Sequence, residues 1–376
     1  MKKTIKMAFV GCGFVSDYYM RTLKYYPDLE LIGVYDRNME RTRAFSSHYS
    51  IPGFETLEDL LRIGDLDLVV NLTTPESHYE VSKKILQAGK HLYSEKPFTL
   101  NTEHSEELVM LAQKNNLLVS GAPCSVLGAN AQEIRQQIEK QVIGAPRLVY
   151  IEMEDGPIHL MGADKWTNDF GVPWPVDNEF EMGSSLEHLG YPISWALYLF
   201  GAVSTSVSAT TCVLPEKKVG GKIFSSTDFS VAVLTHKSGV VTRITCGIAG
   251  PMNRSIMVVG DGGYLEVEDI WDNQSPVKRL KFEKIRLKAA RKKIIANNWL
   301  GQALFGLNPK KVSTNTKRFS QFGLAKNNMK MDYLLGVNDL AQAILSGTPP
   351  KLSAEFLLEV NALTLQINEG DVVRVL

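Results

Sequence analysis

The sequence predicts an α/β protein in two parts: a parallel sheet flanked by helices, then an α+β part with an open, mainly antiparallel sheet. Three observations support this. The 376 residues suffice for about two domains of ~150 residues each. Up to residue 120, short apolar runs alternate with helical patterns, which is typical of βαβ units. From Arg147 onward the apolar runs are longer and closer together, with turn signals at 237–239 and 260–263.

The first part is expected to hold five strands, and its helices carry start and stop signals. Thr56 followed by Asp59 and Ser77 followed by Glu80 match the capping box, and Gly89 stands where a helix C-cap glycine belongs. The expected strands are Ile5–Val10, Leu29–Tyr35, 66–72, His91–Ser94 and 117–120.

The second part is expected to contain one strong helix at 192–200, an antiparallel sheet, and two further helices at 331–345 and 353–368. These patterns predict domains at 1–122 and 123–376, and the helix at 353–368 can pack back on the first domain.

Composition excludes several classes of protein. Lys plus Arg and Asp plus Glu are both 41, which argues against a dedicated nucleic-acid binder. None of the four cysteines forms a C-x-x-C pair, so a disulfide scaffold and a zinc ribbon are excluded, and we expect reduced thiols and no metal. No stretch approaches the ~18 consecutive apolar residues that a membrane-spanning helix needs. The lysines at the start precede an apolar run, as in a signal peptide, but this run is short and suits a first strand better. We therefore expect a cytoplasmic protein without a membrane span.

Charge is uneven along the chain. The segment 277–320 holds thirteen Lys or Arg and one acid, Glu283. Its net charge is therefore +12, and the net charge of the rest of the chain is −12. We expect this segment to be an insertion in the second domain. One interpretation is a solvated basic helix or an oligomer contact. The other is a patch for an acidic or phosphorylated ligand or an anionic membrane, although its basic residues do not keep to one helix face.

A glycine-rich motif predicts a dinucleotide site. Gly11, Gly13 and Ser16 follow the first strand and open a helix, and Asp36 ends the second strand 25 residues after Gly11. Glycine lets the backbone turn tightly and approach a pyrophosphate, the helix N-terminus offers free N–H groups, and a carboxylate accepts bonds from the ribose of NAD. The adjacent Arg37 can bind the 2′-phosphate of NADP, so NAD(H) is favoured and NADP(H) stays an alternative.

Three further motifs are the residues TTPESH at 73–78, AGKHLYSEKPF at 88–98 and IGAP at 143–146. They closely resemble motifs of the glucose–fructose oxidoreductase, inositol dehydrogenase and rhizopine-catabolism (Gfo/Idh/MocA) family, in which the last of them resembles the entry to the second domain. The resemblance implies a Rossmann first domain and a second-domain sheet that often forms the oligomer interface, so we expect a homodimer or homotetramer. It also implies that Lys96, before a cis bond to Pro97, contacts the reacting oxygen beside the nicotinamide. The expected cofactor-binding residues are Gly11, Gly13, Phe14, Val15, Asp36, Arg37, Thr73, Thr74, Pro75, His78, Glu95 and Lys96.

Elementary chemistry supports a role for Lys96. A hydride leaves a C–OH carbon only as the hydroxyl proton is removed, so a group of tunable pKa must touch that oxygen. Lysine shifts its pKa readily on burial, and its charge stabilises a developing alkoxide.

The residues before Pro192 depart from the family pattern. The resemblance implies an Asp and, four residues later, a His; here those positions hold Glu187 and Tyr191, and His188 is an additional candidate. Proline cannot donate to the carbonyl of His188, so we expect Pro192 as a first helical residue and a turn or kink over 187–190. Any of Glu187, His188 and Tyr191 could face the nicotinamide, with His188 favoured as proton relay because imidazole titrates near working pH. Glu187 is expected to orient or hold the substrate.

The function that these residues predict is hydride transfer between NAD(P) and a hydroxyl or keto carbon of a sugar, a sugar derivative (possibly nucleotide-linked) or a cyclitol. A Trp-, Pro- and Asp-rich loop over 164–179 suits polyol recognition. The alternatives are an NAD-dependent oxidation–elimination enzyme of lyase or glycosidase type, and a non-catalytic NAD-binding regulator.

Overall fold

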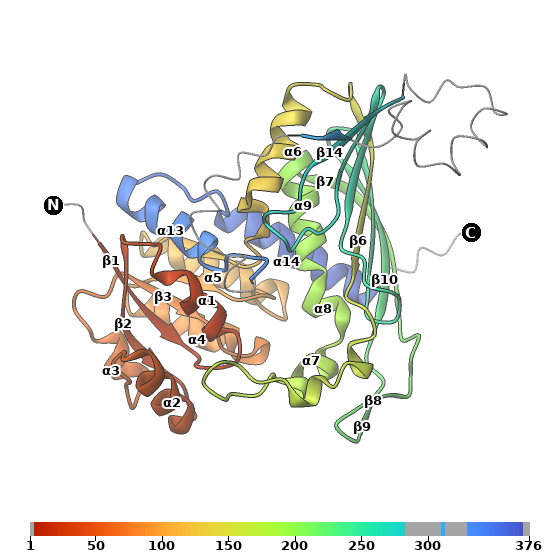
Figure 1. Cartoon of the computed structure of the whole chain (residues 1–376). Helices are drawn as coiled ribbons and strands as arrows, with labels where there is room; N and C mark the ends of the chain where they lie inside the picture. The colour runs from red at the N-terminus through yellow and green to blue at the C-terminus, as the bar shows by residue number, and fades with distance from the viewer. Residues whose placement is uncertain (1–3, 283–309, 313–328, 371–376) are drawn as a thin grey trace.

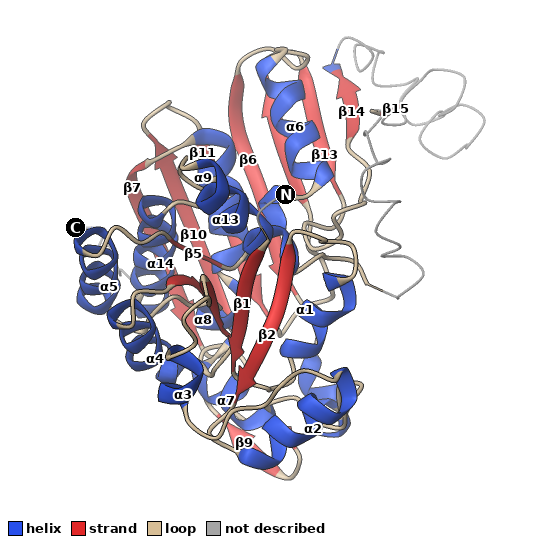
Figure 2. Ribbon diagram, turned by 90° about the vertical axis from the view of Figure 1, so that its left-hand side faces the viewer, coloured by secondary structure: helices blue, strands red, loops and turns tan. Residues whose placement is uncertain are grey.

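The computed structural model describes residues 4–282, 310–312 and 329–370, and its first part is built on a five-stranded sheet. All neighbouring strands in this sheet are parallel, in the order β2-β1-β3-β4-β5. Helices α4 and α5 lie on one side of the sheet and α1 on the other (Figure 2). The strands are β1 Ile5–Val10, β2 Leu29–Tyr35, β3 Leu68–Asn71, β4 His91–Ser94 and β5 Val119–Gly121; the helices are α1 Ser16–Leu23, α2 Met39–Tyr49, α3 Leu57–Leu61, α4 Pro75–Gln87 and α5 Thr102–Lys114.

Local signals account for most of these helix ends. The Thr56 side chain accepts a bond from the Asp59 N–H, so the predicted cap is confirmed. Gly89 has φ +72°, a left-handed conformation that glycine adopts freely just past the end of α4. The predicted start at Ser77 is wrong. Helix α4 begins at Pro75, because a proline at the first helical position has no N–H that would need a partner.

The second part is built on an eight-stranded sheet in the order β15-β14-β13-β12-β6-β11-β10-β7. Its pairs are antiparallel except β6 with β11, so the sheet is mixed and mainly antiparallel. Its strands are β6 Pro146–Glu154, β7 Val203–Thr211, β10 Phe229–His236, β11 Val241–Gly247, β12 Ile256–Gly260, β13 Gly263–Val267, β14 Lys278–Lys281 and β15 Lys310–Lys311; β8 Lys217–Val219 and β9 Lys222–Phe224 form a separate hairpin.

Helices cover one face of this sheet, where α6, α9 and α14 pack in Figure 1. Trp195 of α9 is fully buried there. The opposite face carries the exposed side chains of Leu148, Tyr150, Val207 and Val233. The helices of this part are η1 Ser125–Leu127, α6 Ala129–Glu139, η2 Ile158–Leu160, η3 Ala163–Lys165, α7 Val176–Met182, α8 Ser184–His188, α9 Gly190–Phe200, α13 Leu334–Ser346 and α14 Ala354–Glu369.

The last two helices return to the first sheet. Leu334 and Val337 of α13 belong to the same apolar core as β1 and β3, and Gly336 lies so close to Tyr93 that a Cβ would be 2.3 Å from its hydroxyl oxygen. Helix α14 touches both parts: its Asn361 donates a 2.9 Å bond to Ser105 of α5, while Val360 joins the core of the second sheet. The predicted helix at 353–368 therefore packs on both parts.

Only a fraction of the basic segment lies within the described residues. Lys278–Lys281 forms β14, and Lys310–Lys311 pairs with it as β15 at the edge of the second sheet. The remaining predictions for 277–320 concern residues 283–309 and 313–320, which lie outside the described residues. Among the residues that are described, no helix combines the length and apolarity needed to cross a bilayer.

Candidate active site

A cleft of about 1090 Å³ lies where the carboxyl ends of β1 to β4 face loops of the second part. Ligands of open parallel sheets bind at such ends, beside the point where the strand order reverses. Here that point lies between β1 and β3. The cleft wall includes all of the predicted catalytic residues, Lys96, Glu187, His188 and Tyr191.

The glycine loop after β1 has the shape that a phosphate cradle requires. Gly11 has φ +103°, and a Cβ there would lie 2.5 Å from the carbonyl oxygen of Leu72, so only glycine fits. Gly13 has open space on its Cβ side, and α1 begins three residues later. An eight-residue helix whose first N–H groups face the cleft is suited to bind a pyrophosphate.

Asp36 directly follows β2 and lies in the cleft wall, with 7% of its surface exposed. Its two carboxylate oxygens accept bonds from the backbone N–H groups of Cys12 and Asn38, each at 2.8 Å. The carboxylate therefore fixes the glycine loop as well as facing the position of a ribose. Arg37 and Arg41 lie in the same part of the wall.

The remaining predicted cofactor residues divide into two groups. Phe14, Val15, Thr73, Thr74, Pro75 and Glu95 line the cleft. His78 does not; it is fully buried, with Nδ1 2.6 Å from the carbonyl oxygen of Pro97 and Nε2 3.0 Å from that of Thr73. Burial lowers the pKa of His78. This ring joins the two loops that form the cleft wall, which is a positioning role.

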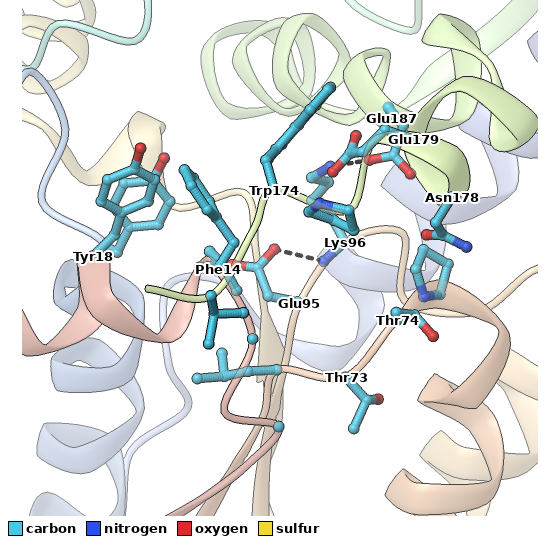
Figure 3. Close-up of a pocket in the computed structure, with 18 of the residues that line it drawn as sticks. Phe14, Tyr18, Thr73, Thr74, Glu95, Lys96, Trp174, Asn178, Glu179 and Glu187 are labelled. Atoms are coloured by element: carbon cyan, nitrogen blue, oxygen red, sulfur yellow. Dashed lines mark hydrogen bonds and ion pairs between the residues drawn. The ribbon is translucent and has the colours of Figure 1, made fainter. Parts of the chain in front are cut away.

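Lys96 follows β4, and the Lys96–Pro97 bond is cis, as the family resemblance implies. Its Nζ forms an ion pair with the Glu187 carboxylate, across the two parts of the protein (Figure 3). Burial would lower the pKa of Lys96, but the charge of Glu187 outweighs it, and the pKa is raised. Lys96 is therefore an ammonium group at neutral pH, with 18% of its side chain exposed to the cleft.

The segment that carries Glu187 is broken into three short helices. Gly183 separates α7 from α8 with φ +83°, and a Cβ there would lie 2.7 Å from the carbonyl oxygen of Thr227. Leu189 separates α8 from α9. Pro192 is the third residue of α9, so the prediction that it begins the helix is wrong, and so is the predicted turn over 187–190. Glu187 and His188 belong to α8 and Gly190 to α9, so only Leu189 lies between the two helices. These interruptions let consecutive turns aim side chains into the cleft.

His188 pairs with an acid that the sequence did not indicate. Its Nε2 lies 3.1 Å from Oδ2 of Asp155, just past the end of β6. Burial, reinforced by Lys96, lowers the pKa of His188 to about 3, so the expectation that it titrates near working pH is wrong. Burial raises the pKa of Asp155 to about 7 despite the nearby Arg254. His188 is therefore a neutral ring at neutral pH, and burial favours the protonated form of Asp155.

Aromatic and basic side chains complete the wall around His188. The Trp271 ring lies 5.9 Å from His188 and 4.8 Å from Tyr191, and the Arg254 guanidinium stacks on it at 4.6 Å. Within the described residues, His188 Nδ1 and Trp271 Nε1 are buried and have no hydrogen-bond partner. Buried polar atoms of this kind carry a desolvation cost that a polar ligand would relieve.

The predicted Trp- and Asp-rich loop closes the cleft at the nucleotide end. Asn168 donates to the carbonyl oxygen of Gly13 at 3.3 Å, and Phe170 packs edge-on against Phe45 of α2. Trp166 and Trp174 line the cleft with their rings 5.3 Å apart. The loop thus connects the second part to the glycine loop of the first.

Sequence reasoning missed Asp155, Arg254 and Trp271, and it named Glu179 only within a loop. They come from four separate elements or turns, and no spacing motif links them. An acid at the end of a central strand could have singled out Asp155, because strand ends meet at one edge of a sheet. Within the described ranges, no three His, Cys, Asp or Glu side chains are grouped closely enough to hold a metal ion.

Comparison with known proteins assigns the family. Residues 5–122 match the family model described as "Oxidoreductase family, NAD-binding Rossmann fold", and residues 131–266 match the "GFO/IDH/MocA C-terminal domain". The chain belongs to the Gfo/Idh/MocA family. The fold class expected from sequence is confirmed by both matches. Gfo/Idh/MocA members carry an NAD(P)-binding Rossmann domain, and the glycine cradle of this chain fits that cofactor.

Curated Gfo/Idh/MocA relatives are distant dehydrogenases. The chain is 30% identical to UDP-N-acetylglucosamine 3-dehydrogenase of Acidithiobacillus ferrooxidans over 40% of this chain and 45% of the relative. It is 27% identical to D-apiose dehydrogenase of Paraburkholderia graminis over 68% of this chain and 63% of the relative. It is 22% identical to trans-1,2-dihydrobenzene-1,2-diol dehydrogenase of Xenopus tropicalis over 79% of this chain and 86% of the relative. The matches to the first two thus span less than two thirds of those relatives.

Solved Gfo/Idh/MocA structures share the fold over nearly the whole chain. KijD10, a 3-ketoreductase from Actinomadura kijaniata, superposes with a TM-score of 0.72 at 19% identity and covers 98% of both chains. The WlbA dehydrogenase from Bordetella pertussis superposes with a TM-score of 0.71 at 19% identity, and the match covers 98% of this chain and 96% of that chain.

Proposed function

We propose that this protein transfers a hydride between NAD(P) and a C–OH or C=O carbon of a sugar, a sugar derivative (possibly nucleotide-linked) or a cyclitol. The observation that carries the proposal is the Lys96 ammonium, which lies in the cleft between the glycine cradle and the Glu187 carboxylate. A nicotinamide bound in the cleft supplies or accepts the hydride. Lys96 supplies the proton to the substrate oxygen or takes it away.

The other cleft residues position Lys96 and bind the substrate. Glu187 holds the Lys96 ammonium in position, and the neutral His188 and the Tyr191 phenol are placed to bind substrate oxygens. The unpartnered His188 Nδ1 and Trp271 Nε1 offer polar contacts to hydroxyl groups. Aromatic rings beside polar groups suit the faces and edges of a sugar or cyclitol. Relatives named for UDP-N-acetylglucosamine, D-apiose and scyllo-inositol support this substrate class.

We infer that NAD(H) is preferred over NADP(H). A carboxylate at Asp36 repels a 2′-phosphate, and its place at the end of β2 supports contact with the ribose. Arg37 and Arg41 would favour NADP(H) instead, because a guanidinium group can bind the 2′-phosphate. The similar structures do not share one cofactor, since KijD10 holds NADP and WlbA holds NADH. We also propose a cytoplasmic homo-oligomer that uses the open face around Tyr150 and Val207.

The function is tested by a thermal-shift screen of sugars, sugar acids, cyclitols and nucleotide sugars with NADH present, followed by turnover assays of the hits with NAD⁺ and with NADH. Ligand that binds only the folded state stabilises it by about 2.7 kcal/mol at 100 times its Kd. Stabilisation by a carbohydrate together with change in NADH absorbance is expected. Product without net NADH change would instead mark an oxidation–elimination enzyme, and binding of NADH without any turnover would mark a regulator.

Cofactor preference is tested by Asp36→Ser. The variant should bind NADH more weakly, because the ribose loses its carboxylate partner. The difference between the affinities for NADH and NADPH should become smaller, because the carboxylate no longer repels the 2′-phosphate. Arg37→Ser is the matched control, since it should weaken NADPH and leave NADH nearly unchanged. Tighter binding of NADPH than NADH by the unaltered protein would contradict the inference.

A further inference from the structure

Three carboxyl groups lie around Lys96. Glu187 pairs with Nζ, Glu95 accepts from the Lys96 backbone N–H at 3.0 Å, and Glu179 of α7 contacts the Glu187 carboxyl (Figure 3). All three line the cleft. Ionising both contacting carboxyls, Glu179 and Glu187, against the single Lys96 cation would place two like charges side by side in a largely buried part of the cleft, which is costly. One of the three carboxyls therefore keeps a proton.

The hydrogen bonds identify which group holds that proton. Glu95 accepts from the Tyr19 hydroxyl at 2.6 Å as well as from the Lys96 N–H, so both of its partners are donors. Glu187 accepts from the Lys96 ammonium. In the part of the chain that the structure describes, Glu179 has neither a cation pair nor an N–H donor, and its partner is the Glu187 carboxyl.

The titration behaviour of the pair agrees with this assignment. Burial and the neighbouring Glu187 raise the pKa of Glu179 well above its usual value. Burial opposes ionisation of Glu187 too, but the Lys96 ammonium outweighs it and lowers the pKa of that carboxyl. Two contacting carboxyls that share one proton are a known arrangement in acid–base sites.

We propose that Glu179 is the proton reservoir for Lys96, acting through Glu187 when a carbonyl substrate is reduced. This rests on the proposed function. Lys96 breaks an N–H bond as the substrate oxygen gains its proton, which leaves a neutral amine. The Glu179 O–H bond breaks as its proton moves to the Glu187 carboxylate, and Glu187 passes a proton to the amine, which forms a new N–H bond. The net result is an ammonium at Lys96 and a carboxylate at Glu179, and the two electrons of the reduction come with the hydride.

The location of Glu179 suits this task. Its side chain is half-buried in the cleft wall, so it can regain a proton from solvent, whereas Glu187 is buried with 4% of its side chain exposed. In the resting state the Lys96 ammonium and the Glu179 carboxyl both hold protons. Reduction of a carbonyl can therefore begin at once, while oxidation of a hydroxyl must first remove a proton from Lys96.

The stored proton is tested without any substrate. The infrared difference spectrum between the unaltered protein and Glu179→Gln should contain the carbonyl stretch of a protonated carboxylic acid at neutral pH, and this band should shift in D₂O. Glu181→Gln is the matched control, because Glu181 is an exposed acid of the same helix. Absence of the band would overturn the proposal irrespective of turnover.

The relay itself is tested with the carbonyl substrate that the screen identifies. Glu179→Gln should retain the KM and NADH affinity within a few-fold and lower kcat by about 10²-fold, the lower end of what a proton-transfer group contributes. Glu179→Ala should regain rate as small carboxylic acids are added, and Glu181→Gln should match the unaltered protein.

Each remaining outcome has a definite meaning. A kcat loss that no added acid restores, or an unchanged kcat and pH profile in Glu179→Gln, would overturn the relay. A protein that binds NADH, shows the band and turns over none of the screened compounds would contradict the proposed function, and the relay with it.

Discussion

At the scale of single residues, charge compensation governs the cleft. The Lys96 ammonium offsets the Glu187 carboxylate, and Asp155 lies 3.1 Å from the neutral His188 ring. Both pairs are largely buried, and removing Lys96 would leave the Glu187 carboxylate without its cation. Two predictions follow from these pairs.

Replacing Lys96 tests the group that contacts the reacting oxygen. Lys96→Met keeps most of the side-chain volume and removes the charge, so we expect kcat to fall by roughly 10²–10⁴ with NADH binding within a few-fold. The variant should also lose stability as pH rises, because Glu187 must then ionise without its cation. Steady-state kinetics and melting temperatures from pH 5 to 9 measure both effects. Near-normal turnover would contradict the mechanism.

Asp155 should make the stability of the protein depend on pH. Its folded pKa of about 7 lies above the usual value for an aspartate, so the folded state binds more protons than the unfolded state between these two values. Stability from this group is fully present below the unfolded pKa and is lost as pH rises through about 7. Asp155→Asn should flatten this decline in melting temperature from pH 4 to 7. An unchanged slope would show that another group causes it.

At the scale of elements, the junction between α7 and α8 sets the distance between Glu179 and Glu187. Gly183 makes this junction possible, since it combines a positive φ with close approach to the Thr227 backbone. His188 at the end of α8 and Tyr191 near the start of α9 lie on either side of Leu189 and line the same cleft.

Gly183→Ala tests this junction. The strained φ and the clash should together destabilise the protein by about 3 kcal/mol or more and displace Glu187 from Lys96. Gly171→Ala is the matched control, because Gly171 has φ +84° and open space on its Cβ side, and it should lose only about 1 kcal/mol. Denaturant unfolding compares the two. Equal losses would mean that the Thr227 contact relaxes.

At the scale of the whole molecule, the C-terminal region ties the two parts together. Asp332, just before α13, is fully buried and accepts bonds from Thr22 at 2.7 Å and Tyr26 at 2.6 Å. Helix α13 completes the core of the first sheet, and α14 contacts both sheets. The first sheet therefore depends on residues some 300 positions later in the chain.

Asp332→Ala should reduce the free energy of unfolding by about 2–4 kcal/mol, because two buried hydroxyls lose their acceptor. Asp332→Asn keeps one carbonyl oxygen and should lose less. Urea unfolding followed by circular dichroism measures both variants. A negligible loss in Asp332→Ala would show that solvent replaces the carboxylate and that the connection contributes little.

Local patterns in the sequence were sufficient to predict the fold class, the five parallel strands and the glycine loop. These features depend on contacts between near neighbours: short apolar runs define the strands, and Gly11 is required where the chain turns directly after β1. The motif around Lys96 also lies within one short segment. Its placement in the cleft follows from the rule that parallel strands bind ligands at their carboxyl ends.

Tertiary structure alone decided the partners in the site. Lys96 meets Glu187 across 91 positions of sequence, and His188 meets Asp155 from another strand end, so no local spacing could predict either pair. Burial then changes the chemistry: the pKa of His188 is lowered to about 3, although the sequence favoured it as the titrating group. Desolvation depends on everything packed around a group, and long-range packing therefore determines which side chain holds a proton.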